Sequence, residues 1–452
     1  MSGLLEKKLS RRGFLKAGAA MAGASLMAAC APPAAPAAAP AAGEAAQPAE
    51  TAVTLITWVQ GDPLSESPYN ETRNKIIAMF EEANPGIKLQ LEGSSERIDE
   101  KVLLTVKAGN PPDLTMVSAQ MRESHVHAGT LRDLEDYLAM EDKAWVDDLP
   151  GIHNANATSS VDGKRYCILL SLHSRLIYYR TDMCPAEPAT WQDIVDFGKA
   201  VADPDKGIWG FNFFGNKPWS VEVEFGPFIW MQGANTCEND GRATFATDAA
   251  EAAILFHRDL IHVHKISSIA NVTSGFGDMW AQFQAGQVAM CVQGTYAFPI
   301  GVKEQMKELW EAGKVWAAPI PPKEKGGNSA NFANGWAWGI PKGSKHSDEA
   351  WKFIRFHSRP DIQVMHSRVE GGAPITKSAW TDKTLYADEI WGKVMLPNLE
   401  KWGRPMDPYV YYMEELTALA VAIEESLVNP DSDIMGNLKR AEEEFNKKYY
   451  PA

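Results

Sequence analysis

The 452-residue chain is poor in the residue patterns that carry most enzyme chemistry. It has five cysteines, and its histidine pairs His125/His127 and His262/His264 have no further Cys or His at the intervals that hold zinc. It contains no Gly-x-Ser-x-Gly elbow, no His-Glu-x-x-His helix and no Walker-type phosphate loop. These absences predict no metal, no cofactor and no catalytic residues.

The chain is also short of positive charge. It has 44 Lys and Arg against 58 Asp and Glu, a formal charge of −14. The first 29 residues hold five basic residues and one acid, so the remainder carries 39 basic and 57 acidic residues and a formal charge of −18. Binding to nucleic acid depends on clustered Lys and Arg that neutralise phosphates, so no nucleic-acid partner is expected.

The longest apolar stretch near the N-terminus is too short to span a membrane. It covers residues 17–29, whereas a hydrocarbon layer of ~30 Å needs roughly 20 residues. Basic residues precede it and small residues follow, so residues 1–29 are predicted to be an export signal. "SRRGFLK" resembles a twin-arginine signal, and "LMAAC" resembles a bacterial lipobox in which Cys30 is lipidated, with Met27 where leucine is usual.

The segment after Cys30 has almost nothing to bury. Residues 31–50 read "APPAAPAAAPAAGEAAQPAE", and their prolines favour an extended polyproline II conformation. We therefore predict a lipidated cysteine and a tether over residues 30–52. The chain is expected to be exported and anchored to the outer face of the cell membrane, or to be periplasmic.

The body from residue 53 onward has about 400 residues, more than a single hydrophobic core usually organises, so two domains are expected. It contains four cysteines. Cys167 and Cys291 stand in apolar runs typical of buried thiols. Cys184 and Cys237 stand in loop-like sequence, and the sequence leaves open whether these two form a disulfide.

Hydrophobic periodicity predicts alternating strands and helices along the body. The first unit is βαβαβ, with strands at 53–58, 87–92 and 113–117 and helices at 74–83 and 99–108. Later strands are predicted at 174–179, 208–214, 287–294, 315–321 and 335–341, and later helices at 190–203, 248–262, 278–285, 347–358 and 414–427. Thr190 is the predicted N-cap of its helix. No short-period repeat occurs, which excludes a solenoid.

Several segments occur in an order that resembles the extracellular solute-binding proteins of ABC importers, in the sugar-binding group. They are "FEEANPGIKLQLE", "KAGNPPDLTMV", "VDGKRYCILLSLHSRLIYYRTDM", "ATWQDIVDFGKAV", "FQAGQVAMCVQGTYAFP" and "NGWAWGIPKGSKHSDEAWKFIRF" with "GGAPITKSAW". The resemblance implies an α/β, two-lobed periplasmic-binding-protein-like fold. Each lobe would be a mostly parallel sheet flanked by helices, and hinge strands would cross between the lobes.

The resemblance also implies how the chain is divided and what it does. Lobe 1 would comprise residues 53–170 plus about 296–345, and lobe 2 about 171–295 plus 346–452. The monomeric protein would capture a sugar or oligosaccharide between the closing lobes and deliver it to an ABC permease.

Polar residues that directly follow the first three strands are the predicted ligand contacts on lobe 1. Proteins with parallel sheets bind their ligands at the carboxyl ends of the strands. Asp62 is the strongest of these contacts, since the family has a ligand contact at that position; the alternative is an Asx turn before Pro63. Ser95, Ser118 and Gln120 are further candidates, although short polar residues after strands also cap helices.

Three polar candidates lie farther along the chain. His173 stands in the crossing segment, where the family often has a polar contact at the hinge, or it is structural. Arg175 would clamp a pair of hydroxyls or an anionic substituent, or pair with a neighbouring acid. Glu222, in "KPWSVEVEFG", is the candidate from lobe 2.

Aromatic and glycine candidates complete the predicted site. Carbohydrates need flat apolar surfaces for their C–H faces, and the chain has 15 Trp and 12 Tyr. Tyr296 falls where the family has a stacking Trp, and Trp336 follows Asn334-Gly335. Gly372 would allow close approach of the backbone to the ligand, or would only make a turn.

Two rival functions stay open at this stage. The same fold could bind a solute other than sugar, such as glycerol phosphate, a polyamine or a peptide. A protein of another class, a secreted carbohydrate-active enzyme, would need two carboxylates at a defined separation, which sequence does not show.

Overall fold

The computed structural model describes residues 52–94, 98–215, 218–387, 390–405 and 409–451. Residues 51–452 form one compact unit. The predicted export signal, the tether up to residue 51, Cys30 and Ser95 lie outside the described residues.

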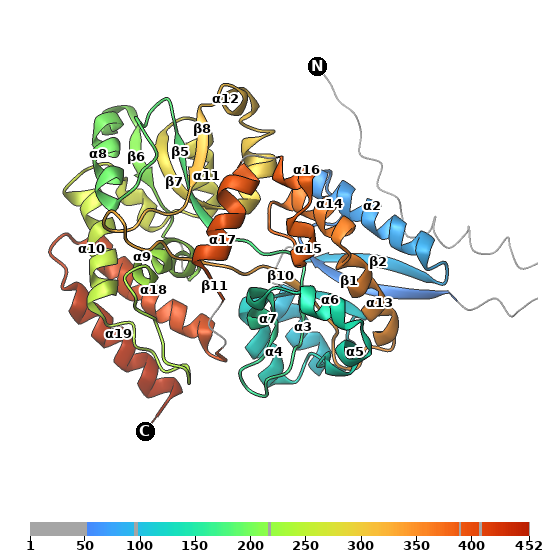
Figure 1. Ribbon diagram of the computed structural model, residues 1–452. Coiled ribbons are helices and arrows are strands. Elements are labelled where there is room, and N and C mark those ends of the chain that lie inside the picture. The colour runs from blue at the N-terminus through green and yellow to red at the C-terminus, as the bar shows by residue number, and fades with distance from the viewer. Residues whose placement is uncertain (1–51, 95–97, 216–217, 388–389, 406–408, 452) are drawn as a thin grey trace, which may run out of the picture. The chain divides into compact units, whose positions relative to one another are not determined.

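The first sheet has the strand order β2-β1-β3-β10-β4 (Figure 1). β1 pairs in parallel with β2 and with β3, which confirms the predicted βαβαβ unit. β10 pairs antiparallel with β3 and with β4. The strands are β1 (Val53–Gln60), β2 (Ile87–Ser94), β3 (Leu114–Ser118), β4 (Ile168–Leu169) and β10 (Trp336–Gly339).

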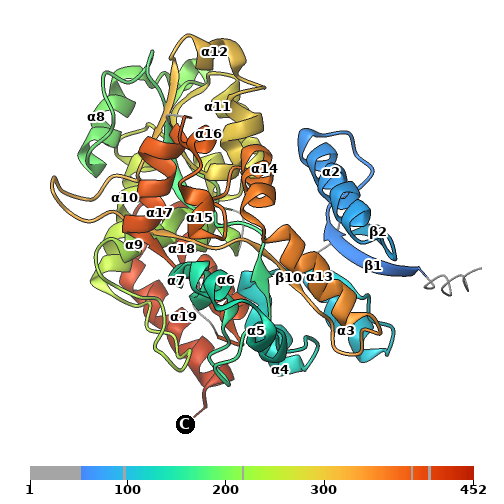
Figure 2. The same cartoon turned by 45° about the vertical axis from the view of Figure 1, so that its right-hand side comes forward.

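The helices of the first unit follow from its apolar spacing. In α2 (Pro68–Ala83), Ile76 and Phe80 are buried because they recur on one face four residues apart. α2 begins six residues before the predicted start, because Ser67 caps it by accepting from the Asn70 amide and proline is favourable at the first helical position. Figure 2 shows α2 alongside β1 and β2, with α3 (Ile98–Lys107) next to the same sheet.

The second sheet has the order β6-β7-β5-β8. Its strands are β5 (Arg175–Arg180), β6 (Trp209–Asn212), β7 (Val288–Gly294) and β8 (Val315–Ala318). β6 is parallel to β7, whereas β5 is antiparallel to both β7 and β8. Each sheet is therefore mostly parallel, as predicted, with one reversed strand: β10 in the first sheet and β5 in the second.

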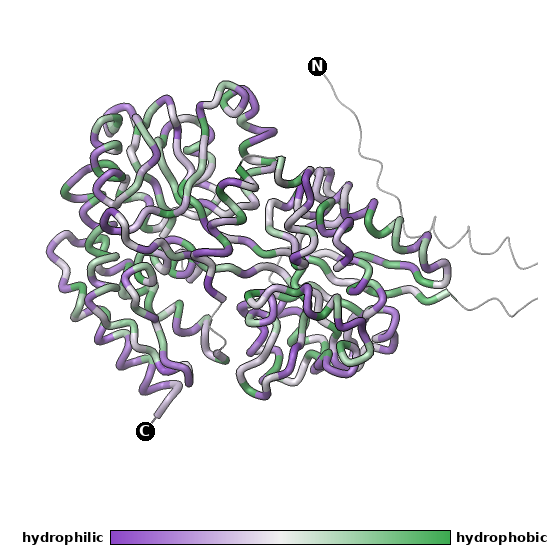
Figure 3. The backbone as a smooth tube through the Cα atoms, in the orientation of Figure 1, coloured by the Kyte–Doolittle hydropathy of each residue, from purple (hydrophilic) through white to green (hydrophobic). Residues whose placement is uncertain are grey.

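Helices pack around the second sheet. α8 (Trp191–Val201) lies against β6, and Thr190 caps it by accepting from the Asp193 amide, as predicted. α10 (Asp248–His262) contacts α18 (Tyr412–Val428) and α19 (Ile434–Tyr449). In Figure 3 the outer helix α19 is largely hydrophilic, as expected of a helix that packs by one face only.

The remaining helices and turns have short spans. Those on the N-terminal half are η1 (Ala119–Met121), α4 (Arg122–Ala128), α5 (Glu135–Met140), α6 (Lys143–Asp148), α7 (Gly151–Ala157), η2 (Pro204–Lys206), η3 (Val221–Phe225) and α9 (Gly226–Trp230). Those on the C-terminal half are η4 (Ile269–Val272), α11 (Phe276–Gln284), η5 (Thr295–Ala297), η6 (Phe298–Val302), α12 (Lys307–Glu311), α13 (Ser347–His357), α14 (Pro360–Glu370), α15 (Lys377–Trp380), α16 (Lys383–Tyr386), η7 (Trp391–Met395) and α17 (Leu396–Trp402). Two short strands, β9 (Asn331–Phe332) and β11 (Gly403–Arg404), pair with each other.

Strand pairing and helix packing differ from the predicted lobe boundaries at two places. β8 lies inside the predicted lobe 1 segment 296–345, yet it pairs with β5 in the second sheet. α13 and α14 lie inside the predicted lobe 2 segment 346–452, yet both contact α2. We infer from these contacts a first lobe of residues 53–170 plus 336–380 and a second lobe of residues 175–332 plus 391–451.

The four cysteines of the body, Cys167, Cys184, Cys237 and Cys291, are buried thiols, so Cys184 and Cys237 do not form a disulfide. Burial raises the pKa of the Cys167 thiol to about 12, which keeps it protonated. None of the helices in the described ranges is long and apolar enough to cross a membrane.

Candidate functional site

A cavity of about 440 Å³ lies where the chain crosses between the two sheets. Its lining draws on both lobes and on the crossing segments, and its size is in the range of small-molecule sites. Six of the predicted site residues line it: Ser118, Gln120, His173, Arg175, Tyr296 and Trp336.

The first lobe contributes polar groups from the ends of its strands. Gln60 ends β1, Ser118 ends β3, and Gln120 follows in η1. The Ser118 hydroxyl donates to Gln120 Oε1 at 3.0 Å, and Trp336 pairs in register with Ser118 on the neighbouring strand. The expectation that polar side chains would gather at the carboxyl ends of parallel strands is thus met for these residues.

Asp62 is placed differently from its neighbour Gln60. Its side chain is exposed, its Oδ1 accepts from the Leu64 amide at 2.9 Å, and it does not line the cavity. This is the Asx turn that the sequence offered as the alternative. Gln60 was not predicted, although it stands two residues earlier, at the last position of the strand in "WVQGD".

Arg175 and Tyr296 form the cavity wall on the second lobe. Arg175 Nη1 donates to Gln293 Oε1 at 3.1 Å and to the Tyr296 hydroxyl at 2.9 Å. The guanidinium lies over the rings of Tyr296 and Phe332, 5.4 and 5.3 Å from their centroids. The Arg175 side chain is therefore held in one orientation by two acceptors and two rings.

Gly294 makes room for the ring of Tyr296. A Cβ atom on Gly294 would lie 2.2 Å from the Tyr296 ring, so any larger residue would displace it. Burial raises the pKa of the Tyr296 hydroxyl, with Arg175 opposing, so the group stays neutral and can donate a hydrogen bond as well as accept one.

His173 joins the crossing segments. Its amide donates to the Asn334 carbonyl at 2.7 Å, and its ring Nδ1 lies 3.2 Å from the Thr295 hydroxyl. Its Nε2 makes a short contact with Glu370, which also lines the cavity. Burial works to raise the pKa of Glu370, but the charge and hydrogen bond of His173 lower it to about 2.

Gly372 supports this pair and does not line the cavity. Its amide donates to Glu370 Oε2 at 3.2 Å, and a Cβ atom there would lie 2.8 Å from both Glu370 and Ser171. The backbone of Gly372 therefore lies close to the carboxylate of Glu370, whereas the prediction placed it close to the ligand. Glu370 was not predicted. It is the last residue of α14, and nothing in the sequence indicates that it contacts His173.

Two glutamates of the π-helical turn η3 lie next to the cavity. Glu222 is fully buried and accepts from Gln120 Nε2, and from Asn334 Nδ2 at 3.5 Å, so it links η3 to the first lobe and to a crossing segment. Glu224 is also fully buried, and neither of its oxygens has a hydrogen-bond partner among the described residues. Burial raises the pKa of Glu224 well above the usual glutamate value, and Arg175 opposes this only in part.

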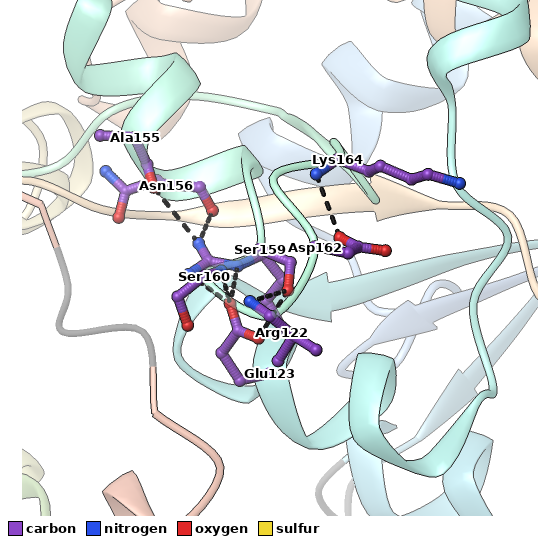
Figure 4. Close-up of polar contacts among 9 residues, drawn as sticks. Arg122, Glu123, Ala155, Asn156, Ser159, Ser160, Asp162 and Lys164 are labelled. Carbon is purple, nitrogen blue, oxygen red and sulfur yellow. Dashed lines mark hydrogen bonds and ion pairs between the residues drawn. The ribbon is translucent and has the colours of Figure 1, made fainter. Parts of the chain in front are cut away.

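A buried ion pair holds the turn that carries Gln120 (Figure 4). Arg122 donates from Nε and Nη2 to Glu123 Oε1 at 3.1 and 3.0 Å, and both side chains are fully buried. Glu123 also accepts from the Ser159 hydroxyl at 2.8 Å and from the Ser160 amide at 3.0 Å. Arg122 donates to the Asn156 carbonyl as well, so η1 is fixed to the end of α7.

Sequence reasoning also missed several aromatic and amide residues of the lining. These are Tyr69, Trp219, Phe332 and Asn334. Trp219 stands in the polar-aromatic loop from which Glu222 was chosen. Phe332 and Asn334 shortly precede the predicted Trp336 in "NFANGW". Both stretches therefore contained residue types that could have been selected. Within the described ranges, no group of three or more His, Cys, Asp or Glu is arranged to hold a metal ion.

The family model described as "Bacterial extracellular solute-binding protein" matches residues 75–391. The chain is 23% identical over 340 residues to the mannitol-binding protein of Pseudomonas aeruginosa, covering 72% of this chain and 76% of that one. It is 24% identical over 353 residues to the maltooligosaccharide ABC transporter solute-binding lipoprotein of Streptococcus pneumoniae R6, covering 74% and 78%.

Solved structures agree on the fold. The crystal structure of an ABC transporter solute-binding protein from Thermotoga lettingae, bound with α-D-tagatose, superposes with a TM-score of 0.75 at 21% identity. The match covers 87% of this chain and 99% of that one, and it shows a two-lobed α/β fold flanked by helices.

Proposed function

The chain belongs to the bacterial extracellular solute-binding proteins, and on that premise we propose that it captures a sugar or polyol in the cleft between its lobes for delivery to an ABC permease. The observation that carries the proposal is the composition of the 440 Å³ cavity. Aromatic rings from Tyr296, Trp336 and Trp219 face it together with the planar polar groups of Gln120 and Arg175. Rings of this kind cover the C–H faces of a sugar, and planar amide or guanidinium groups fix its hydroxyls.

The relatives support this ligand class. One is named for mannitol, one for maltooligosaccharide, and the tagatose complex holds a single sugar. The Streptococcus pneumoniae relative is a lipoprotein, which supports the predicted lipidation of Cys30 and a place outside the cell membrane. The proposed role is binding without turnover by a monomer.

The mechanism we propose is closure of the lobes on the ligand. The cavity is lined from both lobes and from the crossing segment at His173, so one ligand can touch all three parts. A ligand that makes more contacts in the closed state than in the open state shifts the equilibrium toward closure by that difference in affinity.

A ligand screen tests the proposed function. The purified protein is heated with mono- to tetrasaccharides, polyols, sugar phosphates, polyamines and short peptides, and hits are measured by titration calorimetry. A ligand that binds only the native state adds ~2.7 kcal/mol of stability at 100 times its Kd. A sugar or polyol that is recovered unchanged supports the proposal. A polyamine or peptide as sole hit would overturn the ligand class, and formation of a product would overturn the binding role.

A further inference from the structure

The guanidinium of Arg175 is a buried cation with one unsatisfied edge. Only 5% of the residue is exposed, and both described hydrogen bonds of its side chain leave from Nη1. Its Nε is buried without a partner, and Nη2 makes no hydrogen bond to any described residue. The Nε/Nη2 edge is the pair of parallel donors with which arginine binds a carboxylate.

No acid among the described residues forms an ion pair with Arg175, although three lie near the cavity. Glu222 accepts from Gln120 and Asn334, and Glu370 is bound to His173 and to the Gly372 amide. Glu224 is fully buried, neither of its oxygens contacts Arg175 or any other described donor, and burial raises its pKa well above the usual glutamate value. A buried charge without a counter-ion is costly, so the site gains stability from an anion supplied from outside.

We propose that the ligand is an acidic monosaccharide or acidic polyol whose carboxylate pairs with the guanidinium of Arg175 in the cavity wall. This inference rests on the proposed function and narrows its ligand class. The rings of Tyr296 and Phe332 flank the guanidinium and fix its plane, so the group is oriented before the ligand arrives.

A carboxylate fits this guanidinium better than a phosphate. Arg175 is the one Lys or Arg among the described residues that line the cavity, and the other basic group, His173, is bound to Glu370. One guanidinium balances one negative charge, whereas a phosphate monoester carries nearly two at neutral pH. Ser118, Gln120 and Asn334 line the same cavity, where their hydroxyl and amide groups can contact the hydroxyls of the ligand.

Matched pairs of ligands test the inference. Calorimetric titrations compare galacturonate with galactose, glucuronate with glucose, and gluconate with sorbitol, on wild type, Arg175→Gln and Arg175→Lys. We expect at least one acid to bind about tenfold or more tightly than its neutral partner, as expected of charge-assisted hydrogen bonds. Arg175→Gln should remove that preference, Arg175→Lys should retain part of it, and added salt should weaken it.

Arg180→Gln is the matched control. Arg180 ends the same strand, but Asp182 already occupies its Nε and Nη2, each at 2.8 Å, and it does not line the cavity. This variant should keep the wild-type preference.

Neutral ligands that bind as tightly as their acids to wild type would overturn the inference while leaving the proposed function intact. If Arg175→Gln fails to fold, the acid-to-neutral ratio of wild type and its salt dependence decide the question. Failure of all six ligands, and of the wider sugar panel, would overturn the proposed function and the inference with it.

Discussion

Among single residues, Arg175 of the cavity wall and Glu224 of η3 are both buried, and both have polar atoms without a hydrogen-bond partner among the described residues. Arg175 carries a permanent charge, because a guanidinium is not deprotonated in proteins. Glu224 can take up a proton and become neutral, and burial raises its pKa for that reason. The free energy of unfolding should therefore depend on pH through the ionisation of Glu224.

Glu224→Gln should change how stability depends on pH. Because burial raises its pKa in the folded state, the protonated Glu224 contributes stability that is fully present below the usual glutamate value of 4.5 and is lost as the pH rises through the folded-state pKa. Between pH 4.5 and the folded-state pKa, the free energy of unfolding of wild type should fall by about 1.4 kcal/mol per pH unit relative to that of Glu224→Gln. Urea unfolding at half-unit steps from pH 4.5 to 8 measures this slope.

The exposed Glu308→Gln, on α12, provides the control for that series. The dependence of its unfolding free energy on pH should match that of wild type, because a solvated carboxyl binds its proton equally well in the folded and the unfolded state. Parallel profiles for wild type and Glu224→Gln would show that Glu224 is ionised in the folded protein.

At the element scale, close packing of α8 on β6 shapes the second lobe. The two elements meet through Gly198 and Gly210, and a Cβ on Gly210 would lie 2.2 Å from the Cα of Gly198. Only glycine allows a helix to approach a strand this closely. β6 in turn pairs with β7, which leads directly to Gly294 and the wall formed by Tyr296.

Gly210→Ala should therefore destabilise the protein by about 1–3 kcal/mol, because backbone atoms of α8 would have to move. Thermal and urea unfolding measure the change. Gly277→Ala is the control, since a Cβ at this position of α11 meets nothing within 4 Å and alanine favours a helix over glycine. A Gly210→Ala protein as stable as Gly277→Ala would contradict the packing argument.

At the scale of the whole molecule, Glu222 provides a direct link between the lobes in the absence of ligand. It comes from η3 of the second lobe and accepts from Gln120 of the first lobe and from Asn334 on a crossing segment. Loss of a buried hydrogen bond typically costs about 1–3 kcal/mol, which is enough to shift a balanced open–closed equilibrium.

Small-angle scattering should show that ligand decreases the radius of gyration of wild type. Ligand-free Glu222→Ala should be more expanded than wild type, because a contact between the lobes is lost, and saturating ligand should reduce the difference. Glu135→Ala is the control: Glu135 pairs with Arg165 inside the first lobe at 3.0 Å, so its loss should leave the dimensions unchanged. Equal dimensions with and without ligand would exclude closure.

Sequence patterns were enough to find the strands of four or more residues and part of the helices, and they indicated much of the site. Hydrophobic periodicity and capping located β1, β2, β3, α8 and α10, because these signals are local to each segment. Strand ends and the family resemblance together indicated six residues that line the cavity.

Contacts between distant segments became known from the three-dimensional fold. It placed β8 in the second sheet and α14 beside α2, brought Glu370 to His173, and excluded Asp62 from the cavity. It also left one edge of Arg175 without an acid partner among the described residues. Pairing between residues far apart in the chain depends on packing of the whole fold, and the spacing of residues along the sequence carries no record of it.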